Sequence, residues 1–233
     1  MTGMTDPEYS LERLEVLPPH AVAEVRRIYE DGFPPHQRAG FAELTDRRQD
    51  GEFGLVLIRR DRPCRGQPRG FAMLRPLGRT GMIFLRYFVV DDRERGQGLG
   101  GILWDSLADR LRADGFGLLV FDVDDPDEPG HGPDEVSIRS RRISFYERHG
   151  ARLLPVSGYR TPHVAPHAAG QDDEGPGWTP MLLMTAALAG DFRGSGPGRG
   201  DSRVRGVVDA VYRYRWRLDP GHPQLARVLI DSQ

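Results

Sequence analysis

The sequence contains neither lysine nor asparagine, so each of its 32 basic residues is an arginine. Both missing residues have AT-rich codons, and their joint absence indicates a GC-rich coding sequence. Cysteine is almost missing as well, with Cys64 the only one. A single cysteine excludes a disulfide within the chain and fits a reducing compartment. Cys64 stands among arginines, prolines and glycines, and we expect it to lie in a loop and to be inert.

Long apolar runs are also missing. No stretch approaches the ~18 consecutive apolar residues of a membrane-spanning helix, and the start, MTGMTDPEYS, lacks the basic and apolar regions of a signal peptide. Neither sign of charge is in large excess, because the net charge is −2 and both signs are spread along the chain. No broad basic surface for nucleic acid is therefore indicated. We expect a soluble, cytoplasmic protein that binds neither membranes nor nucleic acid.

The remaining composition suits one generous domain with an extension. Hydrophobic residues make up 38 % of the 233 residues, enough for a core, and 29 glycines and 19 prolines predict many turns. The Gly-rich segment 189–206 is typical of a flexible linker. We therefore expect a domain over 1–188 and a C-terminal helical extension over 207–233. The aromatic and arginine run at 212–217 could stack on nucleic-acid bases, but a packing helix whose arginines reach solvent is the interpretation we favour.

Hydrophobic periodicity predicts a mixed α/β domain. The segments 53–58, 71–74 and 82–90 suggest an antiparallel meander, and 82–90 is apolar on both faces, as a central strand should be. Strands are predicted at 10–17, 53–58, 71–74, 82–90, 118–123, 151–156 and 181–187, and helices at 18–33, 36–48, 98–114, 136–149, 207–216 and 223–230.

The most informative stretch runs from Met82 to Trp104, where a strand leads through a glycine-rich turn into a helix. The first N–H groups of a helix have no helical partners, and the helix dipole adds positive charge there, so such a site suits a phosphate or pyrophosphate. Gly96, Gly98 and Gly100 remove the side chains that would keep an anion away from the backbone. This turn is the predicted anion-binding site.

The motif Arg95-Gly96-Gln97-Gly98-Leu99-Gly100 resembles the acyl-CoA loop of the GNAT family of N-acyltransferases, which reads Arg/Gln-x-x-Gly-x-Gly/Ala. A second segment, Phe145-Tyr146-Glu147-Arg148-His149-Gly150, is similar to the aromatic-Tyr-Glu-x-x-Gly segment that closes a later helix in that family. The resemblance is firm over 82–155 and extends over 10–187. It implies a GNAT-like fold with a mostly antiparallel central sheet flanked by helices.

The resemblance also implies a reaction and its residues. Acetyl-CoA would be the acyl donor, without a metal, and the amine acceptor would attack the thioester directly. The backbone from Arg95 to Gly101 would hold the pyrophosphate, and a splayed central strand would pair with the pantetheine arm and the thioester carbonyl. Tyr146 would protonate the departing thiolate. The implied donor-binding residues are Phe88, Val89, Val90, Arg95, Gly96, Gln97, Gly98, Leu99, Gly100 and Gly101.

Two departures from the family pattern stand out. Where members often carry a glutamate as general base on the central strand, this chain has Arg86, Tyr87 and Phe88. Where members often have Asn and Ala upstream of the tyrosine, it has Arg139 and Arg142. The first departure leaves the central strand without the family's general base, and the second changes residues that the family places near the pantetheine arm.

An acidic loop between Asp122 and Glu135 offers candidates for the base. It contains no basic residue other than His131, and in a GNAT-like fold it would lie beside the acceptor. Asp122 and Asp124 are the candidate base or substrate anchor, although a solvated surface loop is the ordinary interpretation. We expect a cationic small molecule or a peptide amine as acceptor. The carboxylates on which this rests are Asp122, Asp124, Asp125, Asp127, Glu128, Asp134 and Glu135, with Asp172, Asp173 and Glu174 on a later loop.

Other interpretations stay open. Gly96, Gly98 and Gly101 satisfy the Gly-x-Gly-x-x-Gly pattern of NAD(P)-binding Rossmann proteins, with Asp122 as a ribose ligand. Against this, five residues separate the strand from the first glycine, and Tyr146 has no role in a Rossmann protein.

A GNAT-fold module that binds acyl-CoA without transferring the acyl group is the other alternative. His149, His163 and His167 are scattered, so no metal is expected, and the acceptor's identity and a homodimer are left undecided.

Overall fold

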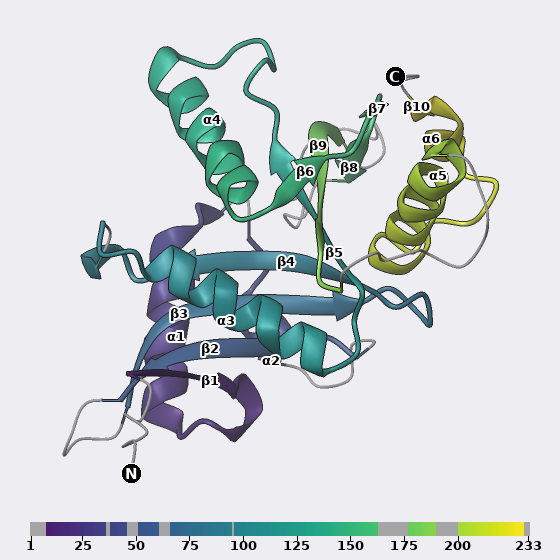
Figure 1. Cartoon of the computed structure of the whole chain (residues 1–233). Helices are drawn as coiled ribbons and strands as arrows, with labels where there is room; N and C mark the ends of the chain where they lie inside the picture. Colours follow the sequence, from purple (N-terminus) through teal and green to yellow (C-terminus); the bar gives the residue numbers. More distant parts are fainter. Residues whose placement is uncertain are drawn as a thin grey trace. The chain divides into compact units, whose positions relative to one another are not determined.

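The computed structural model describes residues 8–35, 38–45, 51–60, 66–94, 96–162, 177–189 and 200–230 (Figure 1). The chain divides into two compact units. The first comprises Met1–Arg75 and Leu85–Arg110, and the second Pro76–Phe84 and Leu111–Gln233. Cys64, His163, His167 and the acidic triplet 172–174 lie outside the described residues, so the expectations placed on them stay predictions.

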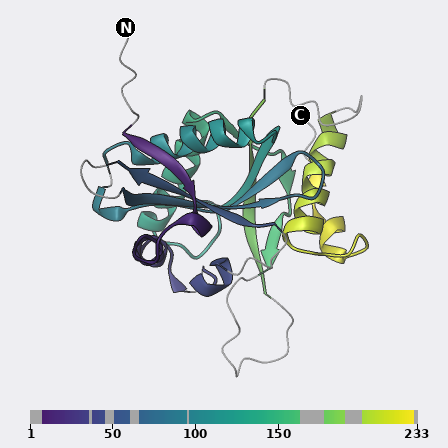
Figure 2. The same ribbon diagram turned by 90° about the horizontal axis from the view of Figure 1, so that it is seen from below.

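The first unit is an antiparallel meander between helices. Its strands β1, β2 and β3 pair antiparallel in chain order, followed by β4. Figures 1 and 2 show α1 and α2 on one face of these strands and α3 on the other. The strands are β1 (Tyr9–Arg13), β2 (Phe53–Arg59), β3 (Gln67–Pro76) and β4 (Met82–Val90), and the helices are η1 (Leu14–Val16), α1 (Pro19–Gly32), α2 (Phe41–Thr45), η3 (Asp92–Glu94) and α3 (Leu99–Ala113).

Both helical layers follow from the apolar spacing in the sequence. In α1, Val25, Ile28 and Tyr29 fall on one face and are fully buried. The Tyr29 ring lies 5.0 Å from that of Tyr87 on β4, in an edge-on arrangement. On the other face, Leu103 of α3 belongs to a buried cluster with residues of β2 and β4. The segment of β4 that leads into the glycine turn is thus packed from both sides.

The second unit is built around β5 and β9. The start of β4 pairs parallel with β5, β5 pairs antiparallel with β9, and β6 and β8 pair antiparallel with β9. A separate ladder joins β7 to β10. The strands are β5 (Leu118–Asp124), β6 (Ala151–Leu153), β7 (Val156–Ser157), β8 (Arg160–Pro162), β9 (Trp178–Ala187) and β10 (Leu229–Ile230), and the helices are α4 (Pro133–Arg148), α5 (Gly200–Ala210), η4 (Val211–Arg215) and α6 (Pro223–Arg227).

The C-terminal helices share the core of the second unit. Val208 and Tyr212 are fully buried in one cluster with Phe84, Val120 and Leu183 from the strands. These residues carry the helical stripe that the sequence predicts after residue 206. The aromatic side chains of the 212–217 run therefore pack in or against this cluster, in agreement with the interpretation of the run as a packing helix.

The predicted fold class is confirmed, because the sheet is mixed and mostly antiparallel and helices flank it. Several boundaries differ from the sequence predictions. The predicted strand 10–17 ends at Arg13, since Leu14 is buried in a 3₁₀ turn and not in the ladder. In the described part of 36–48, helix covers only Phe41–Thr45. α4 begins at Pro133, because proline fits the first helical turn.

At the C-terminus, α5 begins at Gly200, earlier than the predicted start at residue 207, and so includes the end of the predicted linker. The division into 1–188, 189–206 and 207–233 stays a prediction. Among the described residues, no helix has the length and hydrophobicity that a membrane span requires.

Candidate active site

A glycine-rich turn connects β4 to α3. Gly96 and Gly98 have φ values of +82° and +78°, which residues with side chains rarely adopt. A Cβ on either glycine would meet no heavy atom of the described chain within 4 Å. The N–H of Ile102 donates to the Gly98 carbonyl oxygen (3.2 Å), so the N–H groups at 99–101 have no acceptor within the helix. Open space beside such N–H groups can admit a phosphate.

The predicted donor-binding residues of this turn lie together. Gly96, Gln97 and Gly98 form the turn, and 99–101 open α3. Arg95 lies outside the described residues, and its expected contact with phosphate stays a prediction.

The chain just before the turn is held by a buried carboxylate that the sequence analysis missed. Asp91 is fully buried, and its carboxylate accepts a hydrogen bond from Arg27 of α1 (2.7 Å). Its backbone N–H donates to the carbonyl of Arg69 on β3 (2.9 Å). Burial alone would raise the pKa of Asp91, but the hydrogen bonds from Arg27 and the Arg93 N–H lower it below its usual range. These contacts fix where the glycine turn begins.

The ladder between β4 and β5 is short. It runs only from Met82↔Leu118 to Phe84↔Val120, whereas β4 continues to Val90 and β5 to Asp124. The predicted pantetheine-binding residues, Phe88, Val89 and Val90, lie on β4 beyond the last pair. An early end of the ladder is what the predicted splay of the central strand requires, because it leaves backbone groups of β4 without β5 partners.

Tyr146 lies on α4 and is buried, with its ring 4.5 Å from that of Phe121 on β5. Burial raises the pKa of Tyr146 to about 12, with the charge of Arg142 opposing this shift and the charge of Asp122 adding to it. The phenol therefore keeps its proton at neutral pH and can act as a donor.

Asp122 lies on β5 and is half-buried. Its carboxylate accepts a hydrogen bond from the Tyr159 hydroxyl (3.3 Å). Burial raises the pKa of Asp122 to about 6, against the lowering effects of Arg215 and the Tyr159 hydrogen bond. Asp122 and Tyr146 both belong to the second unit, and the charge of Asp122 contributes to the raised pKa of Tyr146. A carboxylate that gains its charge near pH 6 can accept a proton at neutral pH.

Asp124, the other candidate, is neutralised by an arginine. Arg142 of α4 donates to its carboxylate, and Arg139 pairs with Glu128 (2.8 Å) and Glu135 (3.0 Å). The loop itself contains no arginine, but in the structure two arginines of the following helix pair with three of its carboxylates. Arg139 and Arg142 are the arginines that stand where members of the family often have Asn and Ala. Because Arg142 pairs with Asp124, we favour Asp122 over Asp124 as the base.

The central-strand position without a glutamate is occupied by a buried ionic cluster. Arg86 pairs with Glu52 (3.0 Å) and with Glu43 (3.2 Å), and Arg75 also reaches Glu52 (3.2 Å). The side chains of Arg75, Arg86 and Glu52 are at most 6 % exposed. Both carboxylate oxygens of Glu52 are engaged by guanidinium groups, so we do not assign Glu52 as the base.

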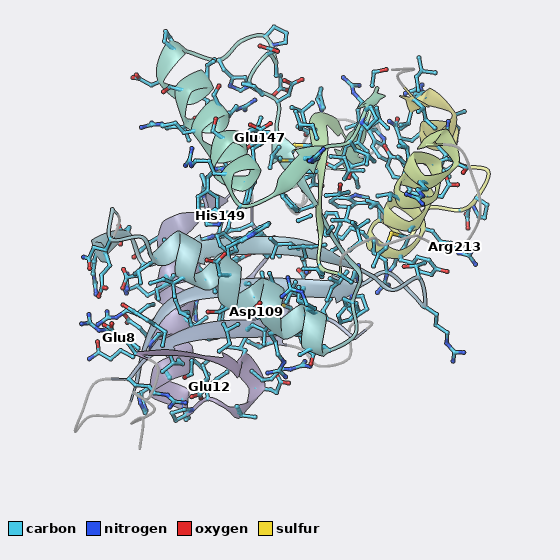
Figure 3. The ribbon with its side chains drawn as sticks, in the orientation of Figure 1. Glu8, Glu12, Asp109, Glu147, His149 and Arg213 are labelled. Carbon is cyan, nitrogen blue, oxygen red and sulfur yellow. The ribbon has the colours of Figure 1, made fainter. Side chains whose placement is uncertain are left out.

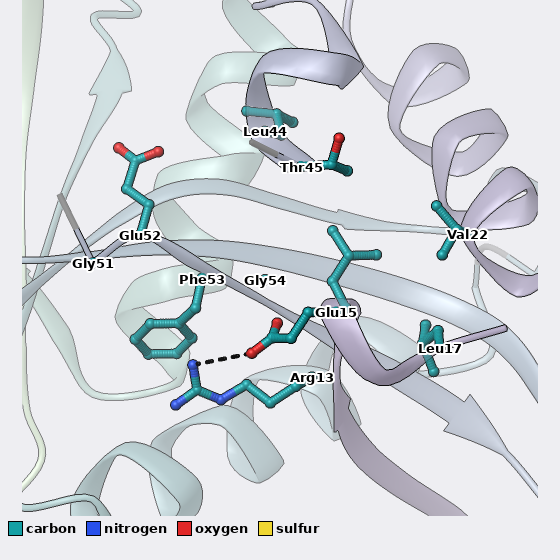
Figure 4. A pocket seen from close by; sticks show the side chains of 11 residues that line it. Arg13, Glu15, Leu17, Val22, Leu44, Thr45, Gly51, Glu52, Phe53 and Gly54 are labelled. Atoms are coloured by element: carbon teal, nitrogen blue, oxygen red, sulfur yellow. Dashed lines mark ion pairs between the residues drawn. The ribbon is translucent and has the colours of Figure 1, made fainter. Parts of the chain in front are cut away.

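A pocket of about 480 Å³ opens in the first unit (Figure 4). Arg13 and Glu15 form an ion pair across it at 3.9 Å. None of the predicted site residues lines it, and we assign it no function. Its lining residues are Arg13, Leu14, Glu15, Leu17, Val22, Leu44, Thr45, Gly51, Glu52, Phe53 and Gly54. In the described ranges of the chain, no group of three His, Cys, Asp or Glu residues could hold a metal ion.

The model of the acetyltransferase (GNAT) family matches residues 22–151, more than half of the chain. The chain belongs to the GNAT acetyltransferase family. The matched range contains the glycine turn, the short β4–β5 ladder and Tyr146.

Solved GNAT structures share the fold at low sequence identity. A protein described as a GNAT-family acetyltransferase from Bacteroides thetaiotaomicron is 20 % identical, with a TM-score of 0.58 over 86 % of this chain and 94 % of that one. The aminoglycoside 6'-N-acetyltransferase from Enterococcus faecium is 17 % identical, with a TM-score of 0.53 over 78 % and 98 %. The ribosomal-protein-S18-alanine N-acetyltransferase from Escherichia coli is 16 % identical, with a TM-score of 0.50 over 79 % and 97 %.

These similarities establish the fold alone. No curated protein sequence matched the chain. The GNAT fold also decides against the Rossmann alternative, because a doubly wound Rossmann sheet is mostly parallel, whereas β5 here pairs antiparallel with β9 along its whole length.

Proposed function

We propose that this GNAT protein transfers an acetyl group from acetyl-CoA to a primary amine by direct attack. The observation that carries the proposal is the open turn at Gly96 and Gly98 before the N-terminus of α3. Family membership supplies the reaction class. The N–H groups of this turn would bind the pyrophosphate of the donor, and the backbone of Phe88–Val90, which lies beyond the end of the β4–β5 ladder, would bind its pantetheine arm.

Two side chains would perform the proton transfers. Asp122, ionised above about pH 6, would accept the proton that the ammonium group loses, directly or through water. The neutral amine then attacks the thioester carbonyl, so a C–N bond forms and the C–S bond breaks, and the second proton that the nitrogen loses passes to the departing thiolate or to solvent. Tyr146 would donate to the departing thiolate. Because a phenol of pKa about 12 is a weaker acid than a thiol of pKa ~8.5, its main contribution would be a hydrogen bond that stabilises the thiolate.

The acceptor is proposed to be a small cationic amine or a peptide amine. The loop between Asp122 and Glu135 carries seven carboxylates, and Arg139 and Arg142 balance only part of this charge. The remaining field would attract a protonated amine, and salt would weaken that attraction because the Debye length is ~8 Å at physiological ionic strength.

Raising the salt concentration should therefore raise KM for the amine and change kcat much less. Reversing the charge of the exposed Asp127 should have the same effect on KM, and the matched reversal of Asp109 on α3, which is also exposed, should not. Steady-state kinetics at several ionic strengths test this expectation. A KM for the preferred amine that is indifferent to salt would contradict a cationic acceptor.

A second candidate is an acyl-CoA-binding module that does not transfer the acyl group. It is favoured by the absence of a glutamate at Arg86, Tyr87 and Phe88 on the central strand, where Arg86 pairs with Glu52 and Glu43. Release of free thiol from acetyl-CoA, measured with a panel of amines, separates the two functions. Thiol release that depends on one amine and is lost in Asp122→Asn supports transfer. Calorimetric binding of acetyl-CoA without thiol release from any amine supports the module.

A further inference from the structure

The Asp122 carboxylate lies at the end of a chain of hydrogen bonds that begins in the C-terminal helical segment. The indole Nε1 of Trp216 donates to the Tyr159 hydroxyl (3.4 Å), and that hydroxyl donates to Asp122 (3.3 Å). Tyr159 is only 3 % exposed, so bulk water does not compete freely for its hydroxyl. The orientation of the carboxylate is thereby linked to a residue almost a hundred positions later in the chain.

Arg215 adds a positive charge to the same surroundings. Its guanidinium carbon lies 4.0 Å from the centre of the Trp216 ring and 5.6 Å from that of Phe84, and the residue is 8 % exposed. Stacking on two aromatic rings holds a guanidinium in place. The charge of Arg215 acts on Asp122 and favours its ionised form.

The backbone of this segment has an unusual geometry. Val211–Arg215 is a π-helix, a widened turn that is rare and often found at functional sites. The Trp216 N–H donates to the Val211 carbonyl (3.2 Å), five residues back. Arg217 follows with a φ of +56°, the only positive φ among the non-glycine residues that the structure describes. This backbone geometry determines the directions in which the side chains of Arg215 and Trp216 point.

The other groups around Asp122 have different partners. The Tyr212 hydroxyl donates to the Arg160 carbonyl (3.0 Å) and accepts from the Arg160 N–H (3.2 Å), so it holds β8. Asp124 is paired with Arg142, and Tyr146 packs on Phe121. The negative charge of Asp124 raises the pKa of Asp122, whereas the positive charge of Arg215 lowers it. The two charges therefore have opposite effects on the protonation of Asp122.

We propose that Tyr159, Arg215 and Trp216 are positioning residues that hold the Asp122 carboxylate in the orientation and charge state of a general base. The C-terminal segment is then part of the active site and not an appendage. This inference rests on the proposed function, in which Asp122 accepts the proton of the amine.

The direct test is a titration of Asp122 in the full-length protein, followed by NMR of ¹³C-labelled aspartate carboxyl groups. Comparison with Asp122→Asn assigns the signal. Arg215→Gln removes the charge that stabilises the carboxylate, so the titration midpoint should rise by about one pH unit or more. Tyr159→Phe removes the hydrogen bond and should raise it by less. Arg215→Lys keeps the positive charge, so the titration midpoint of Asp122 in this variant should lie close to that of the unmodified protein.

Arg213→Gln is the matched control, because Arg213 lies in the same π-helix, has the same charge and is exposed (Figure 3). Its titration midpoint should equal that of the unmodified protein. Circular dichroism shows whether each variant is folded. Should Arg215→Gln fail to fold, Tyr159→Phe, which preserves the ring, carries the test alone. Midpoints in the folded Tyr159→Phe and Arg215→Gln proteins equal to that of Arg213→Gln overturn the inference.

Failure of the proposed function would look different. If Asp122→Asn releases thiol from acetyl-CoA as fast as the unmodified protein with the same amine, Asp122 is not the base, whatever its titration midpoint. If Asp122→Asn is inactive but the midpoint is insensitive to Arg215 and Tyr159, the base assignment stands and the positioning role is overturned.

Discussion

Asp122 and Tyr146 are coupled through their protonation. The charge on Asp122 raises the pKa of Tyr146, and burial raises the pKa of both. As a result Tyr146 is fully protonated at the pH at which Asp122 is ionised. One residue can therefore accept a proton while the other donates a hydrogen bond, which is the pair of roles that direct transfer to an amine requires.

The role of the Tyr146 hydroxyl can be tested by removing it. Tyr146→Phe should lower kcat by ~10²–10³-fold, the usual cost of removing one hydrogen-bond donor to a charge that develops in the transition state, and should leave acetyl-CoA affinity nearly unchanged because the hydroxyl acts as the thiolate departs. Tyr214→Phe removes the same atom elsewhere in the second unit and is the control. Thiol release and calorimetry give the two quantities, and equal turnover by both variants would make Tyr146 a packing residue.

The second prediction concerns pH. The pKa of Asp122 is raised to about 6, so its basic form is present above this pH and is lost as the pH falls through it. The acidic limb of the profile of kcat/KM should therefore have its midpoint near pH 6. In Asp122→Asn this limb should disappear together with most of the activity, whereas Asp109→Asn should retain it. A profile that is flat from pH 5 to 8 would contradict the assignment.

The residues that could be predicted from the sequence are those that stand in local motifs. Tyr146 belongs to such a motif, and Asp122 was found because it ends an apolar strand within an acidic run. Glu52 could not be found, since its partners Arg75 and Arg86 lie on other strands. Arg215 was considered only as part of an aromatic run, because nothing local indicates that it acts on β5. Pairings between remote segments depend on the tertiary fold.

Among the elements, α3 has glycines in the left-handed region at both ends. Gly98 precedes its first residue and has φ +78°, and Gly115 follows its end with φ +89°. A Cβ on either would meet no heavy atom of the described residues within 4 Å. The two positions therefore impose the same backbone cost on a side chain, but only Gly98 adjoins the proposed pyrophosphate site.

This symmetry gives a controlled experiment on the glycine turn. Gly98→Ala and Gly115→Ala should each lower stability by about 1 kcal/mol, because alanine is strained at positive φ. Only Gly98→Ala should also weaken coenzyme A binding, by about tenfold or more, since its methyl group occupies space next to the phosphate-binding N–H groups. Calorimetry with coenzyme A measures the difference, and equal affinity in the two variants would remove the pyrophosphate from this turn.

How well an element could be predicted depended on its length and its end signals. α3 was predicted to within one residue at each end because glycines flank a clear apolar stripe. The short strand β8 was not predicted, β7 begins at the last residue of the predicted strand 151–156, and β10 lies within the predicted helix 223–230, which is wrong beyond Arg227; two or three residues cannot display a periodicity. The π-helix Val211–Arg215 was predicted as ordinary α-helix, because over a single turn the apolar spacing of the two kinds of helix is nearly the same.

For the whole molecule, the question is whether residues after 200 form an independent extension. Val208, Val211 and Tyr212 are fully buried in one cluster with Val120 and Leu183. Burying a large apolar side chain contributes ~1.5–3 kcal/mol, and a native domain is stable by only ~5–15 kcal/mol in total. Loss of several such residues would remove a large part of the stability of the second unit, which also carries Asp122 and Tyr146.

We therefore expect that a chain ending at residue 199 does not fold stably and releases no thiol from acetyl-CoA. A point variant makes the same test without shortening the chain. Val208→Asp places an unpaired charge in this cluster and should lower the free energy of unfolding by at least about 3 kcal/mol. The neighbouring Asp209 is exposed, and Asp209→Ala should change it by no more than about 0.5 kcal/mol. Urea denaturation followed by circular dichroism gives both values. A chain of residues 1–199 that unfolds cooperatively at the same urea concentration as the full chain would show that residues 1–188 form a self-sufficient domain.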